Sequence, residues 1–219
     1  MRKTPEHMSR SRVSSCASTL LALLFVSGCG GGAAEPAEPT TGGGESDTEV
    51  EVVAPEQPET PAVALAELRP TEGNDVRGTV RFEQQGEAVR VTVDLTGLPP
   101  GSRHGFHVHE HGDCSAPDGT SAGGHYNPGG HDHALPEGTP RHAGDMGNVE
   151  SDAAGEVHVE LTFDTFRVDD RTDGRADGDA PPPVMGRGLI VHAEPDDGGQ
   201  PTGNAGARLA CGVIEPVAP

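Results

Sequence analysis

The chain has 219 residues and a formal net charge of −20, with no tryptophan, one tyrosine, 32 glycines and 20 prolines. Because such an acidic surface repels phosphate, the charge argues against nucleic acid as a partner. The composition also excludes a large aromatic core, and it suits short strands joined by many turns, or disorder.

The N-terminal 28 residues have the features of an export signal. A basic start is followed by an apolar run over residues 17–26, which is too short to span a bilayer as a stable anchor. The run ends in Val-Ser-Gly-Cys, a sequence that resembles the bacterial lipoprotein cleavage box. We therefore expect a signal peptide over residues 1–28 and a lipid anchor on Cys29, which places the protein in the cell envelope, attached to a membrane. The alternative is ordinary secretion with cleavage nearby and an unmodified Cys29.

Residues 29–62 are predicted to be a disordered tether. From Gly30 onward they consist mainly of glycine, proline, alanine, threonine and acidic residues, with no basic residue. Such a segment cannot bury enough apolar surface to fold, and repulsion between its charges extends it. Residues 63–219 are therefore expected to form the folded domain.

Strand patterns begin inside this domain. Apolar and polar residues alternate over residues 76–83 and again over 89–95, and Gln85 and Gly86 provide a turn between them, which predicts a hairpin. Residues 64–69 show a weaker pattern for an earlier strand.

The next expected strand, over residues 104–109, places Phe106 and Val108 on one face and the imidazoles of His107 and His109 together on the other. Residues 110–142 show no periodicity and are rich in Gly, Pro, Asp and His. A loop of that length in a compact domain is usually functional or disordered, and its ligand-type residues favour a function.

Three further strands are expected over residues 157–163, 189–192 and 207–214. Residues 169–183 contain no core residues and are interpreted as an exposed insertion. The pattern predicts an all-β domain of about eight short antiparallel strands, a sandwich or a barrel, with no helix.

Histidines are concentrated in one stretch, since eight of the eleven lie within residues 104–145. A single histidine is usually a surface or core residue, but imidazole is also the commonest side-chain metal ligand. Six histidines and one carboxylate around a long loop predict metal binding. These candidates are His107, His109, His125, His133, His142, His192 and Asp145.

Two cysteines remain once Cys16 is assigned to the signal and Cys29 to the anchor. Cys114 and Cys211 could form a disulfide in an oxidising compartment, or stay as two free thiols.

Five motifs resemble successive signatures of the copper/zinc superoxide dismutase family, in the family's order, over residues 64–215. They read GFHVHEHGDC, SAGGHYNP, RHAGDMGNV, GLIVHAEPDD and GNAGARLACGVI. The resemblance implies a Greek-key β-sandwich or barrel with long metal-binding and active-site loops.

The resemblance also implies a ligand set. Copper would be held by His107, His109, His125 and His192, and zinc by His125, His133, His142 and Asp145. His125 would bridge the two metals as an imidazolate and leave and regain copper during turnover. Superoxide would be dismutated to oxygen and hydrogen peroxide by alternating reduction and oxidation of the copper, with zinc in a structural role.

Other positions follow from the same resemblance. Asp196 would orient ligands of both metals, Arg208 would attract superoxide beside the copper, and Cys114 and Cys211 would form the disulfide that anchors the loop. The resemblance does not distinguish a monomer from a homodimer.

Several alternatives stay open. His111 is expected to be an exposed histidine rather than an accessory ligand, and His133 is chosen over His131 because its separations from His125 and His142 fit the family. The segment from His192 to Gly206 is shortened and lacks lysine, so guidance of the substrate rests largely on Arg208. The alternative function is a non-catalytic copper carrier or buffer on the same fold; a zinc-stabilised adhesive domain would leave the copper-type histidines unexplained.

Overall fold

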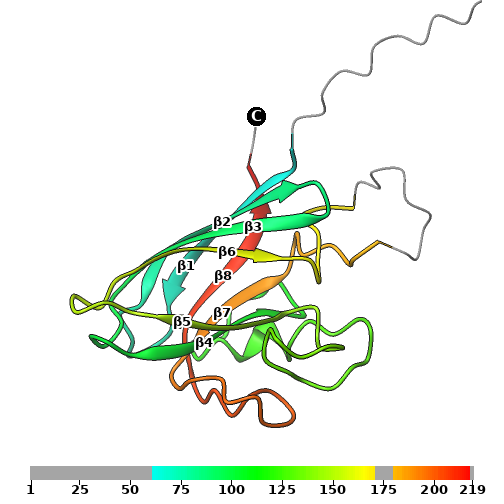
Figure 1. Cartoon of the computed structure of the whole chain (residues 1–219). Coiled ribbons are helices and arrows are strands. Elements are labelled where there is room, and N and C mark those ends of the chain that lie inside the picture. The colour runs from blue at the N-terminus through cyan, green and yellow to red at the C-terminus, as the bar shows by residue number, and fades with distance from the viewer. Residues whose placement is uncertain (1–60, 171–179, 218–219) are drawn as a thin grey trace, which may run out of the picture. The chain divides into compact units, whose positions relative to one another are not determined.

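Eight antiparallel strands form one sheet that curls into a nearly closed barrel (Figure 1) in the computed structural model, which describes residues 61–170 and 180–217. The all-β prediction is therefore confirmed. The strands are β1 (Val63–Pro70), β2 (Arg77–Gln85), β3 (Ala88–Thr96), β4 (Arg103–His109), β5 (Asp145–Glu150), β6 (Val157–Phe163), β7 (Gly188–His192) and β8 (Arg208–Pro216). The signal, nearly all of the tether and residues 171–179 of the insertion lie outside the described residues. Within the described ranges, no helix is long and apolar enough to cross a membrane.

The strand order in the sheet is β5-β4-β7-β8-β1-β2-β3-β6, so neighbours in the sequence are often not neighbours in space. The expected hairpin is present, with β2 and β3 paired from Arg77↔Thr96 to Gln85↔Ala88. The outermost strands β5 and β6 approach each other and nearly close the barrel (Figure 1). This order places β4 beside β7, which sets two histidine-bearing strands side by side.

The barrel interior is filled by the apolar positions of the alternating strands. Along β3, buried and partly exposed residues alternate from Ala88 to Thr96, as a strand with one face on the core requires. Phe82 and Phe166 are fully buried and meet edge to face, with ring centroids 6.2 Å apart. Four phenylalanines suffice in this core because most of its remaining residues are valine, leucine and alanine.

Strand β5 was not predicted. Gly147 adopts a left-handed backbone conformation with φ 79°, and the register against β4 shifts between Gly105 and His107. This irregularity breaks the alternation, and Asp145 and Asn148 belong to residue types depleted in strands. A three-residue 3₁₀ helix, Thr120–Ala122, is also present in the loop that was expected to have no helix.

The expected disulfide joins this loop to the last strand. Cys114 and Cys211 are bonded across a sequence separation of 97, with their Cα atoms 5.8 Å apart. Cys211 lies on β8, opposite Ile190 of β7. The bond therefore fastens the long loop to the side of the sheet that carries His192.

Removing this bond should lower the stability of the domain. In the loop-entropy model, a closed loop of this length restricts the unfolded chain by about 4 to 5 kcal/mol. We expect the double variant Cys114→Ser/Cys211→Ser to unfold at a much lower denaturant concentration than the parent chain, as measured by circular dichroism. Ser115→Ala, which changes the exposed neighbour of Cys114 and keeps the disulfide, is the control and should unfold with the parent chain. Coincident unfolding curves for parent and double variant would contradict this role.

Candidate metal centre

The first three candidate ligands come from the paired strands β4 and β7. Phe106 and Val108 point into the core, so His107 and His109 point to the opposite face, and His192 lies at the end of β7. All three histidines are nevertheless buried, with exposed fractions of 0%, 1% and 6%. The loops beside β4 and β7 therefore cover this outer face and enclose the imidazoles.

Backbone hydrogen bonds of neighbouring residues hold His125 beside β4. Tyr126 N donates to Val108 O at 2.9 Å, and Glu110 N donates to Gly124 O at 3.0 Å, so the loop runs along the end of β4. Val108 N in turn donates to Gly144 O at 3.0 Å. A Cβ atom at Gly144 would overlap the carbonyl oxygen of Val108, so glycine is required at this crossing.

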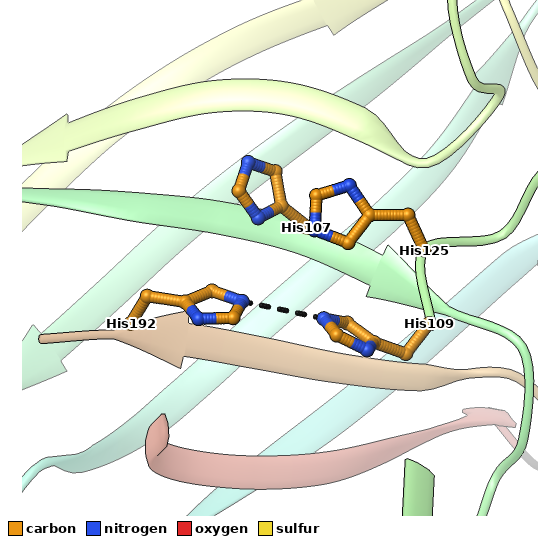
Figure 2. Close-up of side chains that lie close together, drawn as sticks. All are labelled: His107, His109, His125 and His192. Atoms are coloured by element: carbon orange, nitrogen blue, oxygen red, sulfur yellow. Dashed lines mark hydrogen bonds between the residues drawn. The ribbon is translucent and has the colours of Figure 1, made fainter. Parts of the chain in front are cut away.

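His107, His109, His125 and His192 form the four-histidine group, whose ligand nitrogens can all lie within 4.8 Å of one another (Figure 2). His109 Nδ1 donates to Gly123 O at 3.0 Å, and His192 Nδ1 donates to Gly206 O at 3.3 Å. Each ring then keeps its lone pair on Nε2, and these two atoms face each other at 3.3 Å. Two facing lone pairs repel each other unless a proton or a metal ion lies between them.

The other two rings of the group show the same feature. His107 donates from Nε2 to Asp196 Oδ2 at 2.9 Å, which leaves its buried Nδ1 without a hydrogen-bond partner among the described residues. His125 Nε2 is likewise buried and unpartnered there. Buried polar atoms are rarely left in this state, so both nitrogens fit the role of metal ligands.

His125, His133, His142 and Asp145 form a second set, the Asp145 group. Asp145 Oδ1 lies 2.8, 2.9 and 3.1 Å from the Nδ1 atoms of His125, His133 and His142. His133 Nδ1 lies within ion-pair distance of Asp145 but has no hydrogen-bond partner among the described residues. Three imidazoles and one carboxylate match the four-ligand sites of zinc, and His125 belongs to both groups.

Asp196 joins the two groups from the segment between β7 and β8. Its Oδ2 accepts the bond from His107, and its Oδ1 accepts one from His133 Nε2 at 3.0 Å. Gly203, with φ +75°, lies so close that a Cβ there would overlap Asp196 Oδ1. Asn148 fixes the backbone of Asp196, because its amide accepts from Asp196 N at 2.7 Å and donates to Asp196 O at 2.9 Å.

The two groups differ in charge. Burial lowers the pKa of all four rings in the four-histidine group, and that of His192 to about 3. Burial would also lower the pKa of His133, but its contacts with two carboxylates, Asp145 and Asp196, raise it to about 9. At neutral pH the rings of the four-histidine group are therefore uncharged, whereas His133 in the Asp145 group is protonated on both ring nitrogens and carries a positive charge.

Arg208 lies beside the four-histidine group, opposite His192 in the β7–β8 ladder. Its Nη1 donates to Gly119 O and its Nη2 to Gly123 O, each at 2.6 Å. Gly123 O also accepts the bond from His109, so the guanidinium and a candidate ligand bond the same carbonyl oxygen. These contacts hold a positive charge at the edge of the group.

All seven residues expected as ligands are thus brought together in two groups that share His125. Asp196 bonds one ring of each group, and Arg208 bonds the same carbonyl oxygen as His109. His111 is exposed, with its Nε2 3.9 Å from Glu110 Oε2, and His131 is also exposed and belongs to neither group.

His104 was not singled out from the sequence. It is 2% exposed, and its ring bonds the backbone carbonyl of His192 at 2.8 Å and the hydroxyl of Ser102 at 2.6 Å. The alternation of residues along β4 could have indicated its burial, because His104 shares the inward face with Phe106 and Val108. A histidine at an inward position needs buried partners, and here the partner is the backbone of a candidate ligand.

Comparison with known proteins agrees with this geometry. The model of the family described as "Copper/zinc superoxide dismutase (SODC)" matches residues 76–214. The chain belongs to the copper/zinc superoxide dismutase family. It is 40% identical over 162 residues to the "Superoxide dismutase [Cu-Zn]" of Paramecium bursaria Chlorella virus 1, an alignment that covers 70% of this chain and 78% of the viral protein.

A solved structure is similar as well. The crystal structure of the clock protein EA4 superposes with a TM-score of 0.61 at 37% identity, covering 74% of this chain and 99% of that one. The family match includes every residue of the four-histidine and Asp145 groups, together with Asp196 and Arg208. The chemistry of both donor sets fits the two metals of the family name, because imidazole suits copper and zinc alike.

Proposed function

We propose that the protein dismutates superoxide to oxygen and hydrogen peroxide, with copper in the four-histidine group and zinc in the Asp145 group. The observation that carries the proposal is the shared ligand: His125 belongs to both groups, and its Nδ1 faces Asp145 while its Nε2 faces the other three histidines. A carrier of a single metal would have no use for this bridge.

When bound, copper supplies one-electron oxidation and reduction, and zinc supplies a fixed positive charge that orders the loop. The chain supplies the rest. His125 Nε2, buried and otherwise unpartnered, is the position that can hold a proton between successive superoxide encounters. Arg208 provides the positive charge that attracts and orients the anion in a protein with a net charge of −20.

The direct test is an assay of the purified mature protein for superoxide dismutation, with and without added copper, alongside metal analysis. We expect one copper and one zinc per chain and activity that depends on copper. Copper binding without dismutation would instead identify a carrier or buffer.

Proton release should distinguish the two metal sites. Because His133 is protonated below a pKa of about 9, zinc added alone at pH 7 must displace that proton, and the apparent zinc affinity should rise about tenfold per pH unit between pH 7 and 8. The pKa values of the four-histidine group are all lowered, so copper added alone should displace no proton.

Titration calorimetry of the metal-free protein in two buffers of different ionisation enthalpy measures both quantities. A zinc affinity that is independent of pH over this range would contradict the assigned protonation of His133.

We also propose that the mature protein is anchored in the cell envelope through Cys29. Support comes from the basic start, the short apolar run and the small residues before this cysteine. Cys29→Ser should move the protein from the membrane fraction to the soluble fraction of the envelope. Mass spectrometry of the parent N-terminus should find acyl chains, and an unmodified Cys29 would refute the anchor.

A further inference from the structure

A glutamine side chain in the segment between β7 and β8 hydrogen-bonds the backbone of His133, a member of the Asp145 group. Gln200 Nε2 donates to His133 O at 2.6 Å, and Gln200 Oε1 accepts from His133 N at 3.2 Å. Both ends of the amide are thus paired with both backbone groups of a single residue. This reciprocal pairing fixes the position and the orientation of the His133 backbone together.

No other group described in the structure shares this task. His133 is 3% exposed and lies in irregular chain, where no sheet ladder satisfies its backbone. Its N–H and C=O bond only the amide of Gln200 among the residues described. Without that amide, two buried backbone groups would lose their partners, which costs more than an ordinary exposed hydrogen bond.

The same short segment also holds the His133 ring. Asp196 Oδ1 accepts from His133 Nε2, so one segment fixes the residue at its N–H, its C=O and its Nε2. The remaining nitrogen, Nδ1, then points to the centre of the Asp145 group. His107 receives only the Asp196 bond from this segment, and within the described residues the Gln200 side chain bonds no ligand of the four-histidine group.

We infer that Gln200 is a positioning residue that sets the affinity of the Asp145 group for zinc and leaves the four-histidine group largely unaffected. The inference rests on the proposed function, since it assumes that zinc occupies this group. The segment of residues 193–206 is shortened and lacks the lysines expected to guide substrate. Through Gln200 and Asp196, it instead fixes the metal-binding loop in position.

The test compares Gln200→Leu and Gln200→Glu with the parent chain in competition against chromophoric zinc and copper chelators. Leucine removes both hydrogen bonds at similar size, and glutamate keeps the acceptor for His133 N but sets an anionic oxygen against His133 O. We expect zinc to dissociate roughly tenfold more readily from both variants, the scale seen when partners of metal ligands are removed. Copper affinity should stay within about threefold, because the two sites do not share this contact.

Gln85→Leu is the matched control, since it changes an exposed glutamine at the end of β2, away from both groups, and should bind both metals like the parent. Melting of the metal-free proteins shows whether each variant folds, and the glutamate variant tests the proposal if the leucine variant does not. Unchanged zinc affinity, or an equal loss of zinc and copper, would overturn the role of Gln200. A parent chain that binds no zinc would instead refute the proposed function on which the inference rests.

Discussion

Replacing Asp196 by asparagine is expected to weaken the binding of both metals by roughly 10- to 100-fold. The carboxylate accepts hydrogen bonds from the Nε2 atoms of His107 and His133 with different oxygens, at 2.9 and 3.0 Å, and all three side chains are fully buried. Asparagine has one acceptor oxygen, so its amide N–H groups would face one of the two ring N–H donors. That ring must turn, so its Nδ1 no longer points at the metal position. The other ring keeps only a neutral acceptor, which holds it less firmly than the carboxylate does.

The measurement is chelator competition for copper and zinc, combined with the dismutation assay. Asp197→Asn is the matched control, because it removes the same charge from the next residue, which is exposed. Among the described residues, the Asp197 side chain bonds only Gly199 N and the Asn204 amide, both in its own turn. The control should keep both affinities and the activity. Parent-like affinities in Asp196→Asn would show that the two rings do not need this carboxylate.

The dependence on Asp196 shows what the sequence could and could not predict. The period of two in β4 places His107 and His109 on one face, because alternation is a local property of a strand. Their burial is not local. It depends on covering segments such as the one that carries Asp196, 89 residues from His107 in the sequence, and no pattern within β4 contains that information.

The loop ligands show the same limit more strongly. His125, His133 and His142 lie in irregular chain without periodicity, so only the resemblance to a family distinguished His133 from the neighbouring His131. Gln200 offered no signal at all, because a glutamine in a polar loop is ordinary until its amide is seen against the backbone of His133. Contacts between two irregular segments are set by tertiary packing, which local propensity does not encode.

We expect electrostatic guidance of the substrate to depend on Arg208 more than on any other feature of the sequence. The guanidinium is half-buried and held by the carbonyl oxygens of Gly119 and Gly123, beside His192 and His109. A fixed positive charge in such a position raises the local concentration of an anion and its association rate, whereas the net charge of −20 opposes approach from a distance. Dissolved salt screens both effects.

Arg208→Gln is therefore expected to lower kcat/KM for superoxide by about tenfold at low ionic strength, and to reduce the dependence of the rate on salt. Arg208→Lys keeps the charge but loses the two-pronged contact with Gly119 and Gly123, so it should retain an intermediate rate with a parent-like salt dependence. Arg81→Gln removes an equal charge from the outside of β2, which β8 and β1 separate from β7, and it should leave the rate close to that of the parent. Pulse radiolysis over a range of ionic strengths measures all three variants. If Arg208→Gln matches the parent rate while its copper content is unchanged, the positive charge beside the four-histidine group does not guide the anion.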